Sequence, residues 1–202
     1  EDDYNIRSLA VEVNGTRCLT TKGVKQITSP SDLKGVKIRS MEAQVWQDVI
    51  TALGGTPIPV SFSELYMALQ TGVVNGQDNP ISVTYANKLY EVADYIYRTD
   101  HCYNTSMWLI NPDAYDALDE EDRALFDSLV EKYIHGQYRD EMGAYTEKAV
   151  ADIESSGCQI IDSSEFDIQA FYDNAAQLID EKYMTNDAYA PFIQEIRERY
   201  HY

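Results

Sequence analysis

The chain has 202 residues, which is enough for one large domain or two small lobes, and 44% of them are hydrophobic, enough for a buried core. Its 34 acidic residues outnumber its 16 basic ones and give a formal net charge of −18. A surface of that sign repels phosphate backbones, so we expect no nucleic-acid partner. An anion site in such a protein has to be built locally, from a few well-placed arginines.

The cysteine and histidine spacings predict no metal site, and no targeting segment is found in the sequence. Cys18, Cys102 and Cys158 lack C-x-x-C spacing, and their odd number leaves at least one thiol unpaired, so no disulfide is predicted. The three histidines, at 101, 135 and 201, also lack metal-ligand spacing. The sequence contains no run of eighteen apolar residues and no basic segment followed by an apolar one, so neither a membrane span nor a signal peptide is predicted in it.

The first part of the chain is rich in β-forming patterns. Ile6–Val13 alternates as a strand does, with Leu9, Val11 and Val13 on one side. Asn14–Gly15 predicts a turn, followed by a second β-prone run, Thr16–Thr21. A short turn at Ser29–Lys34 then leads to the central stretch of the chain.

Residues 35–80 predict two strand–helix units closed by a third strand. The expected strands are Val36–Arg39, Pro57–Val60 and Val73–Gln77, separated by helices over Met41–Leu53 and from Leu65 to the stop at Gly72. Ser61-Phe-Ser-Glu64 has the form of a capping box that opens the second helix. Strands that alternate with helices this closely indicate parallel pairing with right-handed crossovers.

Three side chains of different chemistry follow the ends of these strands. Arg39 closes the first strand, Phe62 follows the second and Asn79 follows the third. Ligands of open parallel sheets sit beyond the carboxyl ends of the strands, and a guanidinium can hold a carboxylate through two parallel hydrogen bonds. The group therefore suits a small organic anion. Taken alone, Asn79 could simply cap a helix and Phe62 could be a core residue.

The second half of the chain predicts mostly helices. We expect a helix over Ile81–Val92, strands at Tyr95–Thr99 and Tyr103–Ile110, and Trp108 in the core. Asp119–Ser156 reads as 38 residues of helical pattern without proline, about 57 Å if continuous. Such a helix outruns a single lobe, so it either bridges two lobes or breaks near Gly136 or Gly143. The remaining elements are a strand at Cys158–Ile161 and amphipathic helices over Phe166–Tyr183 and Ala188–Tyr200.

Several motifs in the central stretch resemble one known family. They are Asp32-Leu-Lys-Gly-Val-Lys-Ile-Arg39, Ala52-Leu-Gly-Gly-Thr-Pro-Ile-Pro-Val60 and Phe62-Ser-Glu-Leu-Tyr-Met-Ala-Leu-Gln-Thr-Gly-Val-Val-Asn-Gly-Gln-Asp-Asn-Pro80. Their order and separations resemble those of the DctP-type substrate-binding proteins of tripartite ATP-independent periplasmic (TRAP) transporters. The resemblance weakens through the C-terminal helices, and it covers roughly the last two-thirds of a family member.

The resemblance implies a set of ligand-binding residues. In the family, the arginine of the K-I-R motif clamps the substrate carboxylate, which corresponds to Arg39 here. The aromatic residue after the second strand corresponds to Phe62, and the asparagine of G-Q-E-N-P corresponds to Asn79, with Asp78 in place of the usual glutamate. The arginine of the G-x-R turn, a secondary contact, corresponds to Arg17, although a turn arginine is commonly exposed.

Two more ligand-binding candidates come from the same region. Many family members have Val-Pro after the arginine, whereas this chain has Ser40-Met41-Glu42. An acid at position 42 would repel a second carboxylate but accept hydrogen bonds from hydroxyls, which tilts the expected ligand towards a sugar acid or hydroxy acid. Tyr66 is the other candidate; with 16 tyrosines in the chain, the choice of any one is weakly determined.

For the fold, the resemblance implies an α/β protein like the type II periplasmic binding proteins. Such a protein has two lobes with parallel-rich sheets and a long helix that spans both, and here the N-terminal lobe is expected to be incomplete. Residues 1–13 and 105–144 would be its remnant, including part of the long helix. Residues 14–104 and 145–202 would form the C-terminal lobe.

The resulting functional hypothesis is an extracytoplasmic solute receptor, not an enzyme, with no catalytic residue, metal or cofactor. It would bind a small organic anion, such as a sugar acid or a dicarboxylate, and deliver it to TRAP transporter membrane subunits. The location would be periplasmic or extracytoplasmic, with lipid anchoring at the cell surface as a variant and a signal peptide in the precursor. Two alternatives stay open: a ligand-sensing domain of a signalling receptor and an α/β enzyme acting on a small organic acid. Self-association of an incomplete chain is also an open outcome.

Overall fold

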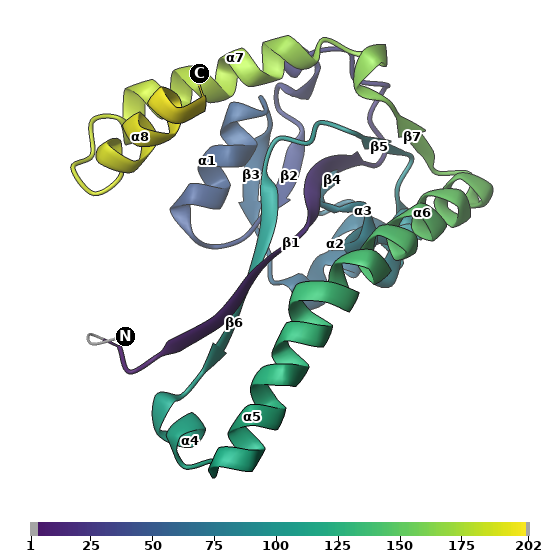
Figure 1. The fold of residues 1–202 in the computed structure, drawn as a ribbon. Coiled ribbons are helices and arrows are strands. Elements are labelled where there is room, and N and C mark those ends of the chain that lie inside the picture. Colours follow the sequence, from purple (N-terminus) through teal and green to yellow (C-terminus); the bar gives the residue numbers. More distant parts are fainter. Residues whose placement is uncertain (1–3, 201–202) are drawn as a thin grey trace.

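A mixed β-sheet organises the computed structural model, which describes residues 4–200. Its strand order is β3-β2-β4-β1-β5-β7, and β6 pairs with β1 off this path (Figure 1). The strands are β1 (Arg7–Thr21), β2 (Lys37–Ser40), β3 (Thr56–Pro59), β4 (Gly76–Pro80), β5 (Tyr95–Tyr97), β6 (Tyr103–Ile110) and β7 (Gln159–Ile161).

The three strands of the central stretch pair in parallel, as the strand–helix alternation predicts. β2 lies between β3 and β4 and is parallel to both. The third strand begins at Gly76 and runs to Pro80, three residues later than expected. Gly76 lies so close to β1 that a Cβ added there would come within 2.4 Å of the Thr20 carbonyl oxygen. This strand therefore needs glycine where it meets β1.

The predicted turn at Asn14–Gly15 is wrong, because β1 is one continuous strand. Its first half pairs antiparallel with β6, and its second half pairs antiparallel with β4 and β5. The register against β6 shifts between Val13 and Thr16, and Gly15 has a φ of +88°. The Asn-Gly pair therefore makes a β-bulge, a feature that redirects a strand without ending it.

Helices cover both faces of the sheet. They are α1 (Gln44–Ala52), α2 (Leu65–Thr71), α3 (Ile81–Ala86), α4 (Pro112–Asp116), α5 (Glu120–Leu129), α6 (Tyr138–Ser156), α7 (Ile168–Leu178) and α8 (Ala190–Tyr200). None of the helices in residues 4–200 combines the length and the apolar composition that a membrane crossing requires.

The start of α2 and the end of α3 differ from the sequence prediction. The Ser61–Glu64 capping box does not form, because the Ser61 hydroxyl donates to the Glu64 carboxylate at 2.5 Å and leaves the backbone uncapped. A 3-10 turn, Phe62–Glu64, opens α2 in its place. The helix expected over 81–92 ends early at α3, since Lys88 adopts a positive φ of 55°, and a 3-10 turn completes the segment.

The long helical stretch is continuous. Asp119 caps it by accepting a hydrogen bond from the Asp122 backbone, and Gly157, at a φ of +98°, ends it. Between α5 and α6 the chain continues as a wider π-helical segment, Val130–Gln137. Gly136 lies in this segment, so the break expected near it does not occur. Figure 1 shows this helix running diagonally away from the sheet, alongside the extended β1–β6 ribbon.

The largest core cluster lies between the sheet and the helices α1 and α7. It includes Leu19, Ile38, Ile50, Leu53 and Phe171, each at most 3% exposed. The prediction that Trp108 is a core residue is wrong: Trp108 is 41% exposed and packs edge-on against the Tyr138 ring of the long helix.

Candidate functional site

Arg39 is a buried cation at the carboxyl end of β2. Its side chain is only 3% exposed, and its Nε donates to the Val60 carbonyl oxygen at 2.8 Å. Burial lowers the pKa of Arg39 from its usual value, with Asp78 opposing that change and Arg17 adding to it, yet an arginine remains charged at neutral pH. Within residues 4–200 no carboxylate forms an ion pair with this guanidinium.

The outer end of the Arg39 fork reaches the surface. Its two Nη atoms have no hydrogen-bond partner in the described part of the chain, and neither of them is enclosed by the protein. Phe62 stands beside it, with the Arg39 Cζ 5.8 Å from the ring centroid and the ring 44% exposed. The backbone therefore fixes one edge of the guanidinium and leaves the other edge free to bind.

Arg17, which the resemblance implies as a secondary ligand contact, is buried and paired, although a turn arginine is commonly exposed. It is 3% exposed because it lies inside β1, and its Nε donates to Asp78 Oδ2 at 2.6 Å. Its Nη2 donates to the Asp78 carbonyl oxygen at 2.5 Å, and its Nη1 donates to Asn104 at 2.9 Å. Within the sheet, Arg17 thus has its own internal counter-ion.

Asp78 remains ionised in this environment. Burial by itself would raise the pKa of Asp78, but hydrogen bonds from His101 and Arg17, together with their charges, outweigh burial and hold it below its usual value. His101 Nε2 lies 3.4 Å from the same carboxylate oxygen that Arg17 contacts. Arg17 therefore has a carboxylate in direct contact, whereas Arg39 feels Asp78 only at a distance.

Asn79 belongs to the same polar group as Arg17. Its Oδ1 accepts a weak hydrogen bond from Arg17 Nη2 at 3.4 Å, and its Nδ2 donates to Gln77 Oε1 at 2.5 Å. Gln77 in turn donates to the hydroxyls of Thr20 and Thr84. This buried network holds the amide of Asn79 in one orientation at the end of β4.

Two other candidates, Glu42 and Tyr66, have no described contact with Arg39. Glu42 is exposed in the loop between β2 and α1, and only its backbone oxygen accepts a hydrogen bond, from Gln47. Tyr66 packs against the cluster that contains Leu69 and Leu89, and its hydroxyl donates to Glu91 at 3.3 Å. The structure therefore brings together Arg39 with Phe62, and Arg17 with Asn79.

Sequence reasoning missed three neighbours of Arg17. The Trp46 ring lies under its guanidinium, 4.8 Å from Cζ to centroid. His101 and Asn104 reach the same cluster from the segment around β6. No local pattern in the sequence indicates contacts between residues this far apart in the chain, and only the alternation within β6 could have placed Asn104 towards the sheet.

Ser40, next to Arg39, is not among the site residues predicted from the sequence. It is 1% exposed, and its hydroxyl is enclosed without a hydrogen-bond partner in the described residues. As for metals, no three histidine, cysteine or acidic residues between positions 4 and 200 cluster closely enough to hold an ion. The three cysteines are free thiols.

Comparison of the whole chain with other proteins finds one matching family. The family model described as bacterial extracellular solute-binding protein, family 7 (DctP), matches residues 1–186. The chain belongs to this family.

Among curated relatives, the ectoine/5-hydroxyectoine-binding periplasmic protein UehA of Ruegeria pomeroyi is 31% identical over 96% of this chain and 58% of its own length. The sialic acid-binding periplasmic protein SiaP of Vibrio cholerae is 35% identical over 64% of this chain and 40% of its own length. This chain thus spans somewhat more than half of the UehA sequence.

Solved structures show the same fold. The ectoine-binding protein of the TeaABC TRAP transporter of Halomonas elongata matches 98% of this chain and 64% of its own, with a TM-score of 0.82 at 27% identity. A TRAP periplasmic solute-binding protein of Roseobacter denitrificans, solved with bound 3-deoxy-D-manno-oct-2-ulosonic acid, matches 90% of this chain and 59% of its own, with a TM-score of 0.81 at 30% identity.

Proposed function

We propose that this chain is the larger part of a periplasmic solute receptor that holds a small organic acid through Arg39 and delivers it to a TRAP transporter. The observation that carries the proposal is the guanidinium of Arg39, fixed along one edge by the Val60 carbonyl and lacking an acidic partner among residues 4–200. Because the fork is already oriented, binding a carboxylate would require little further ordering.

Each neighbour of Arg39 takes a role in this proposal. Phe62 would cover an apolar side of the ligand, since its ring stands beside the guanidinium and is partly exposed. Asn79 would bind a second polar group of the ligand, and Arg17 would position Asn79 more than it would bind the anion itself. We assign no direct contact to Glu42 or Tyr66, although both remain candidates in a closed form of the protein.

The charge balance favours a ligand with one carboxylate and several hydroxyls. Asp78 is the direct partner of Arg17, which leaves Arg39 as the cation of this group without an acid in contact. Among the described residues, the other cation acting on Arg39 is Arg17, which is already paired, so a second carboxylate at this site would meet the field of a protein of net charge −18 without a free cation beside it. We therefore infer a sugar acid or hydroxy acid in preference to a dicarboxylate. The Roseobacter relative, solved with a sugar acid, supports this class.

We further propose that the receptor closes around its ligand by bending between two lobes. Residues 1–13 and 105–144 would belong to one lobe, and residues 14–104 and 145–202 to the other. The bulge at Gly15 and the positive φ of 43° at Asp100 support a bend where these segments meet. Delivery to a transporter fits the names of the relatives, which are binding proteins.

The test is a calorimetric titration of the 202-residue chain with organic acids that carry one or two carboxylates. The panel contains gluconate, glucuronate and lactate as hydroxy monocarboxylates, and succinate and malate as dicarboxylates. We expect at least one hydroxy monocarboxylate to bind more tightly than either dicarboxylate. In Arg39→Gln, affinity should fall about 100-fold, because losing one partner of a buried charged pair costs about 3 kcal/mol.

Arg197→Gln is the matched control. Arg197 is a half-exposed arginine of α8 that pairs with Asp180, far along the chain from β2, and its replacement should leave affinity unchanged. Equal binding by wild type and Arg39→Gln would contradict the clamp. Tight binding of the dicarboxylates alone would retain the receptor and refute the ligand class.

A further inference from the structure

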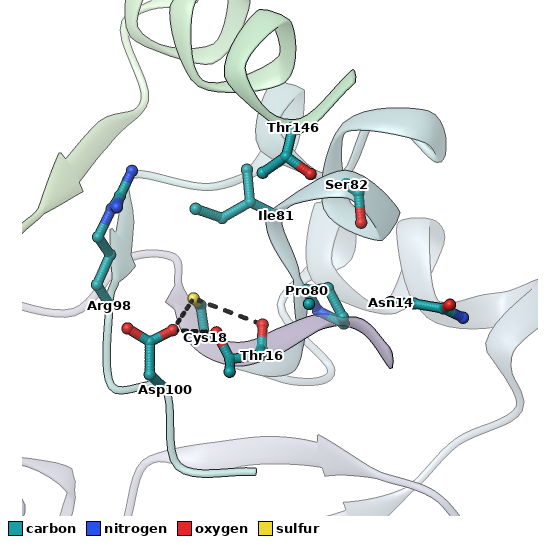
Figure 2. A pocket seen from close by; sticks show the side chains of 10 residues that line it. Asn14, Thr16, Cys18, Pro80, Ile81, Ser82, Arg98, Asp100 and Thr146 are labelled. Atoms are coloured by element: carbon teal, nitrogen blue, oxygen red, sulfur yellow. Dashed lines mark hydrogen bonds between the residues drawn. The ribbon is translucent and has the colours of Figure 1, made fainter. Parts of the chain in front are cut away.

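A polar cavity of about 200 Å³ lies between β1, α3 and α6. Figure 2 shows the side chains that line it: Asn14, Thr16, Cys18, Pro80, Ile81, Ser82, Arg98, Asp100 and Thr146. At about 30 Å³ per water molecule, this volume has room for roughly six waters or one small metabolite. None of Arg39, Phe62 and Asn79 lines it, so it is a different place from the candidate carboxylate site.

Arg98 supplies a positive charge that no carboxylate neutralises by direct contact. Its side chain is half-buried, and within residues 4–200 it forms neither an ion pair nor a side-chain hydrogen bond. Its charge acts on Asp162, and both Arg98 and Asp100 act on Cys18. Neither acid lies within ion-pair distance of Arg98. The guanidinium therefore retains its full set of donors for a ligand.

Asp100 supplies a negative charge with one oxygen still free. Its Oδ1 accepts hydrogen bonds from the Thr16 hydroxyl and, at 3.7 Å, from the Cys18 thiol. Its other oxygen has no hydrogen-bond partner in the described residues and points away from Cys18 in Figure 2. Burial, followed by the charge of Asp100, raises the pKa of Cys18 to about 12, so the thiol stays neutral and adds no charge to the cavity.

Ser82 is a third unused polar group. The residue is only 4% exposed, yet its hydroxyl makes no hydrogen bond with any described residue. Its oxygen is not among the enclosed polar atoms without a partner, so it stays open to the cavity that Ser82 lines. A ligand in the cavity can therefore form a hydrogen bond with this hydroxyl.

We propose that this cavity binds a small zwitterion, a molecule with both a carboxylate and an ammonium group. The carboxylate would accept hydrogen bonds from Arg98 and Ser82, and the ammonium would donate to the free oxygen of Asp100. Arg98 would attract a simple anion but Asp100 would repel it, and Asp100 would attract a simple cation but Arg98 would repel it. Only a ligand that carries both charges satisfies both side chains.

The position of the cavity links its occupancy to the shape of the protein. A bound zwitterion would touch β1 at the Gly15 bulge, the segment after β5 through Arg98 and Asp100, and the long helix at Thr146. These elements meet where the β1–β6 ribbon leaves the rest of the sheet. A ligand bound in the cavity would contact all of these elements at once and so restrict their relative movement. This inference uses different residues from the proposed carboxylate receptor and does not depend on it.

The test is calorimetry of the 202-residue chain with zwitterions of increasing length: glycine, β-alanine and γ-aminobutyrate. Acetate, methylammonium and glycerol serve as the anionic, cationic and neutral controls. We expect one zwitterion to bind at least tenfold more tightly than every control, with the best length reporting the separation of Arg98 and Asp100. No measurable binding by all three, or equal binding by a control, overturns the proposal.

Variants then locate the binding. Arg98→Gln and Asp100→Asn should each weaken the best zwitterion at least tenfold, while Arg39→Gln should leave its affinity within twofold. Asparagine tolerates a positive φ, so Asp100→Asn keeps the backbone and serves if Arg98→Gln does not fold, as judged by circular dichroism. Binding that is lost with Arg39→Gln, or unchanged in Asp100→Asn, would mean that the zwitterion occupies another site.

Discussion

Two parts of this molecule are built from equally good strand and helix sequences but differ in how far they are enclosed. The main sheet, meaning β2 to β5 with β7 and the second half of β1, lies under helices, and each of the three core clusters includes residues of these strands or of the helices that cover them. The arm, meaning residues 7–14 with β6, α4 and α5, projects away from it (Figure 1). Within the arm, Ala10, Glu12 and Tyr115 are buried.

The ribbon of the arm exposes an apolar face to solvent. Val11, Val13, Met107 and Leu109 are each more than half exposed, and Val11 and Met107 are register partners on β1 and β6. Val11 and Val13 belong to the side of the strand that the sequence marks as apolar. The comparison teaches that alternation reports which face of a strand is apolar, whereas burial depends on a second layer that alternation cannot supply.

The largest expected effect is at the buried ion pair of the main sheet. Asp78→Asn leaves Arg17 charged, buried and without its counter-ion, so we expect the free energy of unfolding at pH 7 to fall by about 3 kcal/mol or more. Urea unfolding monitored by circular dichroism measures it. The matched control is Asp180→Asn, which removes the acid of a half-exposed pair with Arg197 and should cost at most about 1 kcal/mol.

The pH dependence sharpens the same test. Because the folded pKa of Asp78 lies below its usual value, its stabilisation is fully present above the unfolded value of about 4. That stabilisation is lost as the pH falls from there through the folded pKa. The difference in unfolding free energy between wild type and Asp78→Asn should therefore shrink towards low pH. A difference that stays constant to pH 2 would contradict an ionised Asp78.

Sequence predicted the strand–helix units of residues 35–80 and the helix stop at Gly72 because each depends on neighbours a few residues apart. It did not predict that Asn14–Gly15 makes a bulge, since a hairpin turn and a bulge use the same residues and only the partner strand β6 decides between them. The family resemblance, together with the strand ends, pointed to Arg39 and Phe62, which lie side by side.

The sequence does not indicate which arginine is paired with an internal acid and which is free to bind a ligand. Arg17 and Asp78 are 61 residues apart, and their contact depends on β1 inserting antiparallel beside β4. The same insertion brings Trp46 and His101 to the cluster, and neither carries a local signal for it. Which cation is neutralised and which is left to bind therefore follows from sheet order, a long-range property.

An intermediate effect is expected at the core of the main sheet. Ile38 is 1% exposed in β2 and belongs to the cluster under α1 and α7. Ile38→Ala removes three carbons from a packed site and should lower the free energy of unfolding by about 2–5 kcal/mol, towards the lower end if the surrounding residues relax. Urea unfolding measures it. A loss below 1 kcal/mol would mean that this part of the sheet is no better packed than the arm.

The smallest effect is expected on the exposed face of the arm. Met107 is 61% exposed opposite Val11, so Met107→Ala gives up only part of one cross-strand pair and should change the unfolding free energy by no more than about 0.5 kcal/mol. The measurement should be repeated after tenfold dilution, because self-association through this face would make stability depend on concentration. A loss above 1 kcal/mol that disappears on dilution would show that a second copy covers the face. The same loss at both concentrations would show that the arm is packed within a single chain, and the contrast with the main sheet would then fail.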